Sequence, residues 1–163
     1  MGYTAKDVMD PNFLTVSPDM TIREAGEVFR QAEKATKQRV FALMVTDDTG
    51  KLVGMLSMYD IFLVLRPKHI HIWGEMNDLD ILDVIDVACN RPGKILVGDI
   101  MTTDLVTITP DTNLLHILDI MIKKHIRRIP VMADGEVIGI VYISKVFFYF
   151  LDKITGTDKI ISE

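Results

Sequence analysis

The sequence has one cysteine, one tryptophan and no apolar run long enough to cross a bilayer. Cys89, the lone cysteine, cannot form a disulfide within the chain, which favours a reducing, cytoplasmic setting. The longest apolar stretches, such as 146–151, are far too short for a transmembrane helix. No apolar stretch follows positive charge near the first residue, so neither a signal peptide nor a membrane association is expected.

Positive charge is also scarce. The sequence has 18 Lys and Arg residues and 23 Asp and Glu residues, which gives a net charge of −5. Binding of a nucleic acid duplex needs an extended basic face, so such a partner is not expected, although a local basic pocket is compatible with this balance. The chain also lacks a nucleophile elbow, a P-loop and a His-Glu-x-x-His motif. We therefore predict no catalytic residues and no enzyme activity.

What the sequence does contain is an internal duplication within 163 residues that are 48% apolar. Three pairs of segments match: 7–9 with 99–101, 14–19 with 106–111, and 50–54 with 135–139. The first two pairs are offset by 92 residues and the third by 85, so the first copy carries seven additional residues. We expect these in the helix and turn around 32–38 or in the loop at 47–49.

Each copy has the pattern of a strand, a helix, a strand, a turn, a strand and a helix. In the first copy these elements are expected at 15–16, 22–29, 41–45, 52–56 and 58–65. In the second they are expected at 106–108, 114–121, 129–132, 137–141 and 144–154. Thr21 and either Thr112 or Asn113 are candidate N-caps. The pattern predicts an α+β fold of two β-α-β-β-α repeats that pack together through their sheets.

A different kind of segment, residues 67–96, joins the copies. Its acidic residues alternate with apolar ones, and the segment ends at 91–93 (Arg-Pro-Gly). It is predicted to be a partly helical linker packed on the repeats or, alternatively, a surface for a protein partner. His69 and His71 could share one face of an extended stretch, but no third ligand accompanies them, so no metal site is expected.

Together the motifs resemble the cystathionine β-synthase (CBS) domain, and the two copies resemble a CBS pair, or Bateman module. The motifs are Asp-Ile-Met-Thr, Thr-Ile-Thr-Pro-Asp, Arg-Arg-Ile-Pro-Val and Gly-Glu-Val-Ile-Gly-Ile-Val. The resemblance implies repeats at 5–66 and 97–154, related by a pseudo-twofold axis, with 67–96 as the linker. It also implies clefts that bind AMP, ADP, ATP or S-adenosylmethionine, a homodimer, and a regulatory role without a required cofactor.

In CBS-like modules, the ribose hydroxyls meet the Asp of a glycine-apolar-Ser/Thr-x-x-Asp motif, which corresponds here to Asp60 with Ser57 beside it. A carboxylate suits ribose because it accepts strong hydrogen bonds. The alternative is structural: Ser57 would cap the next helix, and Asp60 would be an ordinary first-turn carboxylate.

The phosphate residues implied by the resemblance precede the Ile-Pro-Val strand and correspond to Arg127 and Arg128. Arginine suits phosphate because its planar fork offers paired donors. The alternative is a solvated, basic helix end. In the first copy we take Val40 and Phe41 as the equivalent positions, which leaves no cation for phosphate there.

The resemblance implies that each cleft combines residues of both repeats. One cleft would contain Ser57, Asp60, Thr107, Arg127, Arg128, Ile129 and Pro130. The other would contain Thr15, Val40, Phe41, Tyr142 and Lys145, without the ribose acid. We therefore expect one competent adenine-nucleotide site per chain and output through an unknown effector protein. The competing hypothesis is an interaction scaffold with vestigial clefts, which would dock through 75–87 and 146–151.

Overall fold

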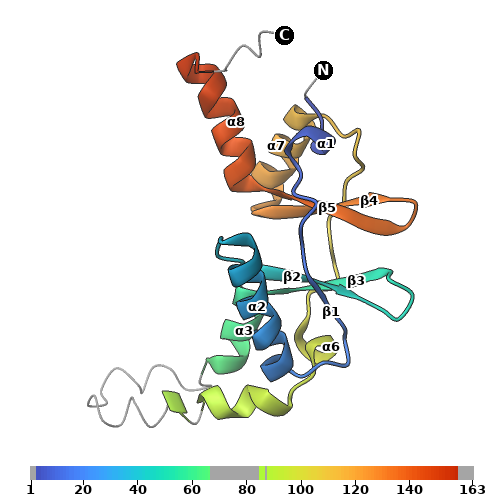
Figure 1. Cartoon of the computed structure of the whole chain (residues 1–163), viewed down its shortest axis with the longest axis vertical. Helices are drawn as coiled ribbons and strands as arrows, with labels where there is room; N and C mark the ends of the chain where they lie inside the picture. Colours follow the sequence, from blue (N-terminus) through green and yellow to red (C-terminus); the bar gives the residue numbers. More distant parts are fainter. Residues whose placement is uncertain (1–2, 67–84, 87, 158–163) are drawn as a thin grey trace. The chain divides into compact units, whose positions relative to one another are not determined.

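The computed structural model describes residues 3–66, 85–86 and 88–157 (Figure 1). It divides into two compact units: unit 1 combines Met1–Phe13 with Val106–Glu163, and unit 2 is Leu14–Leu105. The units do not coincide with the sequence repeats, because the leading segment of each repeat packs with the remaining elements of the other. Most of the joining segment, with His69 and His71, lies outside the described residues; 85–86 and 88–90 are helical.

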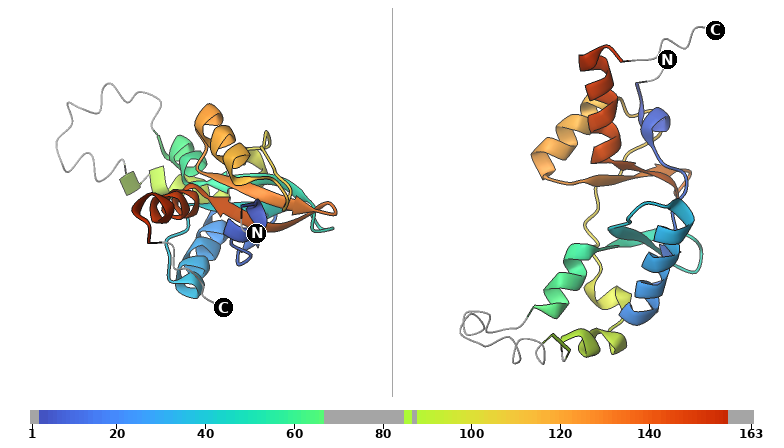
Figure 2. Two further views of the ribbon diagram at one scale, coloured as in Figure 1. Left: turned by 90° about the horizontal axis from the view of Figure 1, so that it is seen from above. Right: turned by 60° about the vertical axis from the view of Figure 1, so that its left-hand side comes forward.

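Unit 2 contains a three-stranded sheet covered on one face by helices. Its elements are β1 (Thr15–Val16), α2 (Ile22–Thr36), β2 (Ala42–Thr46), β3 (Leu52–Ser57), α3 (Met58–Leu65), the 3₁₀ helix η1 (Arg91–Lys94) and α6 (Val97–Ile100). β2 is the central strand; it runs parallel to β1 and antiparallel to β3. Figures 1 and 2 show α2 and α3 on the same side of this sheet. The core consists of Val16, Ile22, Ala25, Leu43, Val45, Leu56 and Val97.

Helix α2 begins where the sequence predicts. Thr21 is its N-cap and accepts a hydrogen bond from the Glu24 backbone, while the Glu24 side chain accepts one from Thr21 in return. Ile22 and Ala25 are buried on the face of the helix that packs into the unit 2 core. The helix ends at Lys37, which adopts the left-handed conformation with φ of 55°.

The short helix α6 is an element that the sequence patterns did not indicate. It is fixed in unit 2 by backbone hydrogen bonds from Val97 to Met20 (2.8 Å) and from Gly98 to Pro18 (2.9 Å). Val97 is fully buried in the unit 2 core. The Asp-Ile-Met segment at 99–101 therefore ends a packed helical turn, which four residues are too few to reveal as a periodic pattern.

Unit 1 is built from a two-stranded hairpin and helices on one side of it (Figures 1 and 2). Its elements are α1 (Ala5–Val8), α7 (Leu114–Lys124), β4 (Arg128–Ala133), β5 (Glu136–Tyr142) and α8 (Ile143–Thr155). The strand expected at 106–108 is reduced to a single parallel bridge between Ile108 and Val131. Asn113, rather than Thr112, caps α7 by accepting a hydrogen bond from the His116 backbone over 2.8 Å.

Helix α1 belongs to unit 1 for the same reason that α6 belongs to unit 2. The Ala5 N–H donates to the Thr112 carbonyl over 2.8 Å, and the Leu114 N–H donates to the Tyr3 carbonyl over 2.8 Å. The unit 1 core consists of Ala5, Val8, Ile108, Leu114, Ile117, Met121, Ile129, Val131, Val141 and Val146.

The seven additional residues of the first copy divide among three places. The offset between copies falls from 92 at the helix starts (Ile22 and Leu114) to 88 at the left-handed caps (Lys37 and His125). It falls to 86 at the starts of β2 and β4, and to 85 at the strand ends Ser57 and Tyr142. Four residues therefore lengthen α2, two lie in the segment after it, and one lies in the β2–β3 turn. The two locations that were expected as alternatives therefore share the additional residues, six in the first and one in the second.

The expected α+β class is confirmed, and so is the order of strands and helices in the first copy. In the second copy the order holds except for the first strand, which is only a bridge. Among the described residues, no helix combines the length and the apolar character needed to cross a membrane.

Candidate ligand-binding site

Ser57 and Asp60 lie where β3 passes into α3 in unit 2. Ser57 is the last residue of the strand and the N-cap of the helix, and Asp60 is the third residue of α3. The two side chains form a capping box: the Asp60 N–H donates to Ser57 Oγ over 3.2 Å, and Asp60 Oδ2 accepts from the Ser57 N–H over 2.8 Å. Ser57 and Asp60 therefore have the structural role considered for them, that of capping α3. This role is compatible with binding a ligand.

Asp60 has a further partner that sequence reasoning missed. The Thr102 hydroxyl donates to Asp60 Oδ1 over 3.0 Å, while the Ser57 hydroxyl donates to Oδ2 over 3.0 Å. Thr102 is held beside β3 by reciprocal backbone hydrogen bonds with Met55, both 2.9 Å. Asp60 is only 9% exposed, so these donors compensate for the burial of its carboxylate. A carboxylate has about four acceptor positions, so a fourth donor can still be accepted.

The signal for Thr102 was available in the repeat. The first Asp-x-Met segment is followed by Asp10, whereas the second is followed by Thr102. Asp10 and Ile140 exchange the same pair of backbone hydrogen bonds in unit 1 as Thr102 and Met55 do in unit 2. The residue after each Asp-x-Met is therefore held beside the final strand of a unit.

Arg127 and Arg128 follow the left-handed end of α7 at His125, and Arg128 begins β4. Arg127 is exposed, and its carbonyl accepts a hydrogen bond from the Ile143 N–H over 2.8 Å. Arg128 is half-buried and lies opposite Tyr142 in the β4–β5 register. The backbone thus fixes both arginines at one end of the hairpin.

Arg128 has an unsatisfied donor. Within the described residues, its buried Nε has no hydrogen-bond partner. Burial lowers the pKa of Arg128, and burial raises the pKa of the neighbouring Tyr142 phenol. Arginine nevertheless stays charged at neutral pH. Because an unmade hydrogen bond of a buried donor is costly, this guanidinium is suited to an added anionic acceptor.

Three other predicted residues lie close to Arg128 in unit 1. Thr107 is exposed and precedes Ile108, whose N–H donates to the Pro130 carbonyl over 3.1 Å. Ile129 belongs to the unit 1 core, and Pro130 is fully buried. The Ile129 side chain therefore serves packing, which leaves its backbone as the part that a ligand could use.

The residues assigned to the second cleft require one correction. Arg128 pairs with Tyr142, and Ala42 pairs with Ser57, so Ala42 is the equivalent of Arg128 and Phe41 the equivalent of Arg127. The expectation of Val40 and Phe41 was wrong by one residue, because it used an offset of 87, whereas the offset at the strand starts is 86. Neither corrected position carries a cation.

The other three residues assigned to the second cleft are Thr15, Tyr142 and Lys145. The last two lie at the start of α8, where no capping box forms. Tyr142 is the N-cap of α8 but makes no side-chain cap hydrogen bond, and Lys145, three residues later, is exposed. Thr15 is exposed in β1, opposite Met44 of β2. The two copies therefore differ chemically at the start of their final helices.

The predicted nucleotide-binding residues belong to different units. Ser57 and Asp60 lie in unit 2, whereas Thr107, Arg127, Arg128, Ile129 and Pro130 lie in unit 1. Each group is assembled within its own unit, and their meeting in one cleft stays a prediction.

The model of the CBS domain matches residues 5–67 and 97–152. The chain belongs to the CBS domain family. It is 31% identical over 154 residues to the chloroplastic CBS domain-containing protein CBSX2 of Arabidopsis thaliana, with 85% of this chain and 60% of that protein covered. It is 30% identical over 138 residues to the CBS domain-containing protein YhcV of Bacillus subtilis, with 85% and 79% covered.

A solved structure extends the likeness to the fold. The crystal structure of CBSX2 in complex with AMP matches with a TM-score of 0.66 at 28% identity, over 94% of this chain and 99% of that chain. The recognition of a tandem CBS pair, made from the motifs, is thereby confirmed.

Proposed function

We propose that this CBS pair is a regulatory module that binds one adenine nucleotide, AMP, ADP or ATP, per chain. The observation that carries the proposal is the half-buried Arg128, whose Nε lacks an acceptor in the described part of the chain. A phosphate oxygen would supply that acceptor and would form a charge-assisted hydrogen bond. The relative CBSX2, solved in complex with AMP, supports an adenine nucleotide as the ligand class.

The ribose half of the proposal depends on Asp60. Its carboxylate already accepts three hydrogen bonds, from the Ser57 N–H, the Ser57 hydroxyl and the Thr102 hydroxyl. The side chain is therefore held in one orientation before any ligand binds. A ribose hydroxyl would be the next donor. Such preorganisation lowers the entropic cost of binding. Lys145, the equivalent residue of the other copy, cannot accept a hydrogen bond, which supports a single competent site.

The regulatory part of the proposal is a homodimer whose geometry changes with ligand. Ligand that binds one arrangement more tightly shifts the population towards it, and a cytoplasmic effector protein would detect the change. Large exposed apolar side chains on α3 of unit 2 and on α8 of unit 1 support association with another chain. They include Tyr59 (65% exposed) and Phe62 (53%) on α3, and Phe147 (58%) and Phe148 (58%) on α8. The same side chains favour the alternative, a protein-interaction scaffold with vestigial clefts.

Calorimetry with AMP, ATP and S-adenosylmethionine tests the nucleotide proposal. We expect one AMP site per chain. AMP and ATP should bind more tightly than S-adenosylmethionine, which offers no phosphate to Arg127 and Arg128. Arg128→Ala should weaken AMP binding at least tenfold, which corresponds to about 1.4 kcal/mol. Arg23→Ala, which removes an exposed arginine from α2, is the matched control and should bind AMP normally.

Asp60 needs a gentler variant because it also caps α3. Asp60→Asn keeps the shape of the side chain, and circular dichroism would confirm that the fold persists.

Two equal strong sites per chain would contradict the single-site proposal. No binding of any of the three ligands, together with a stable dimer in light scattering, would favour the scaffold.

A further inference from the structure

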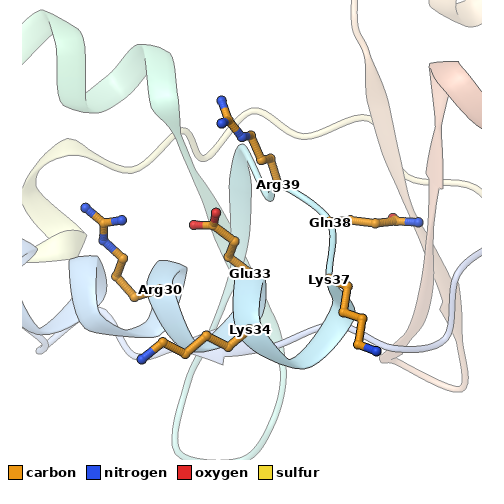
Figure 3. Close-up of a pocket in the computed structure, with 6 residues that line it drawn as sticks. All are labelled: Arg30, Glu33, Lys34, Lys37, Gln38 and Arg39. Atoms are coloured by element: carbon orange, nitrogen blue, oxygen red, sulfur yellow. The ribbon is translucent and has the colours of Figure 1, made fainter.

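A cavity of about 480 Å³ lies on unit 2, at the end of α2 and along the segment that follows it. Figure 3 shows the six side chains that line it: Arg30, Glu33, Lys34, Lys37, Gln38 and Arg39. The volume falls within the range of small-molecule sites. None of the six is among the residues predicted to bind the adenine nucleotide.

The cavity is basic in a chain that is acidic overall. Four of its side chains are cationic and one, Glu33, is anionic, which gives a local charge of +3 against −5 for the whole chain. All six side chains are exposed. Throughout the described ranges, none of the four cations lies within 4.0 Å of a carboxylate oxygen, and Glu33 neutralises none of them.

The cations are arranged along one helix face. Arg30, Lys34 and Lys37 are spaced four and three residues apart, so their side chains project from the same side of α2 and its cap. Like charges at this spacing destabilise an isolated helix. Glu33, three residues after Arg30 and four before Lys37, offsets part of that repulsion, and a bound anion would offset more of it.

The helix macrodipole does not account for this arrangement. It favours a cation in the last turn of a helix, which is the position of Lys34. Arg30 precedes that turn, and the macrodipole effect falls off within one turn. Arg39 comes from the segment beyond the helix end and contributes a second guanidinium to the same cavity.

The cavity is also specific to one copy of the repeat. Four of the additional residues of the first copy lengthen α2, and two more extend the segment before β2. These insertions lie in the part of the chain that carries the lining residues from Glu33 to Arg39. Unit 1, whose helix α7 is shorter, has no counterpart to them. The cavity therefore belongs to the insertion rather than to the shared repeat.

We propose that this cavity binds an anion that carries two or more closely spaced phosphate groups. Arg30 and Lys37 are seven residues apart, or roughly 10 Å at 1.5 Å per residue, which is longer than a single phosphate. Two arginines favour phosphate over carboxylate groups because each fork can hold two phosphate oxygens. The phosphates could belong to a free polyphosphate or to a phosphorylated lipid headgroup, which share this chemistry.

Calorimetry on the full chain with sodium tripolyphosphate tests the proposal. Lys34→Gln/Lys37→Gln, which removes two of the four cations, should weaken binding about tenfold, as two exposed ion pairs would. Lys123→Gln/Lys124→Gln removes the same charge from the equivalent end of α7 and should leave binding unchanged. AMP binding should be the same in both double variants, which separates this cavity from the proposed nucleotide site.

Two further arms distinguish the source of the phosphates. Vesicles of phosphatidylcholine with a phosphoinositide bisphosphate should sediment with the chain, but not with the Lys34/Lys37 variant, if the ligand is a headgroup. Binding of free tripolyphosphate without sedimentation on the vesicles would assign a soluble ligand. The proposal is overturned if neither phosphate form binds, if the Lys123/Lys124 variant loses binding instead, or if decaglutamate or single inorganic phosphate binds as tightly as tripolyphosphate.

Discussion

The Thr102 hydroxyl donates a hydrogen bond to Oδ1 of Asp60 over 3.0 Å, across 42 residues of sequence. Thr102 follows α6, and Asp60 is in the first turn of α3, so the bond joins two elements of unit 2 that the sequence separates widely. The equivalent positions in unit 1 hold Asp10 and Lys145. In unit 1 the carboxylate of Asp10 therefore replaces the uncharged hydroxyl of Thr102, and the cation of Lys145 replaces the carboxylate of Asp60.

Replacing Thr102 with valine tests how much this bond stabilises unit 2. Valine keeps the side-chain shape but removes the hydroxyl, so Asp60 loses one of its donors. We expect a loss of about 1 kcal/mol in the free energy of unfolding, measured by urea denaturation. Thr103→Val is the matched control, because the Thr103 hydroxyl makes no hydrogen bond within the described residues. An equal loss in both variants would mean that the Asp60 bond contributes nothing.

The elements themselves could be predicted from the sequence because their signals are local. Thr21, the Asp-Gly turn at 134–135 and the apolar positions of α2 each act within a few residues, and the structure has a helix or turn at each. The duplication then supplied the order of elements for both copies. Helices α1 and α6 were missed because a four-residue helix has no period to detect.

The contacts of the candidate site could be predicted only in part. Ser57 and Asp60 were identified because they match the glycine-apolar-Ser/Thr-x-x-Asp motif at the junction of a predicted strand and helix. Thr102 was not, because its partnership with Asp60 depends on α6 packing in unit 2 rather than beside its own repeat. The one-residue error at Val40 and Phe41 arose because the insertions are divided among three places, so that no single offset applies throughout.

Lys145 should be an unfavourable residue at the start of α8. It lies in the first turn of a 13-residue helix, where the positive end of the macrodipole disfavours a cation and no side chain caps the helix. Lys145→Glu should raise the free energy of unfolding by about 0.5 kcal/mol at low ionic strength. Lys145→Gln, which only removes the charge, should give a smaller gain, and 1 M NaCl should reduce both. An effect that salt does not alter would point to packing instead of the dipole.

Asp47 should make the stability of unit 2 depend on pH. The Thr49 hydroxyl, followed by the Lys51 N–H, lowers the pKa of Asp47 below its ordinary value of 3.8. A lowered folded-state pKa gives a stabilising contribution that is complete above the ordinary pKa and is lost as pH falls through the lowered one. Asp47→Asn should therefore reduce Tm at pH 7, and the reduction should be smaller at about pH 2, where less of the wild-type carboxyl is ionised.

The neighbouring Asp48 gives the matched control for this titration. Its carboxylate makes no hydrogen bond in the described structure, so Asp48→Asn should leave Tm unchanged at both pH values. If the difference between wild type and Asp47→Asn persists undiminished in acid, the turn is stabilised by the shape of residue 47 and not by its charge.

Gly54 should be intolerant of any side chain, because the chain after α6 lies directly against β3. A Cβ at this position would lie 2.7 Å from Met101 Sδ and 3.0 Å from the Thr102 carbonyl oxygen. The methionine can move, but the backbone oxygen is fixed by its hydrogen bond from the Met55 N–H. Gly54→Ala should therefore lower the free energy of unfolding by roughly 1–3 kcal/mol, measured by urea denaturation.

Gly26 provides the opposite case within the same unit. It lies in the interior of α2, and a Cβ there would meet no atom within 4 Å. Because alanine is the better helix former, Gly26→Ala should raise the free energy of unfolding by about 1 kcal/mol. The two substitutions add the same methyl group with opposite expected signs. Destabilisation by both would show that Gly26 faces a partner surface, such as a second copy of the chain, and that helix propensity is not the deciding term.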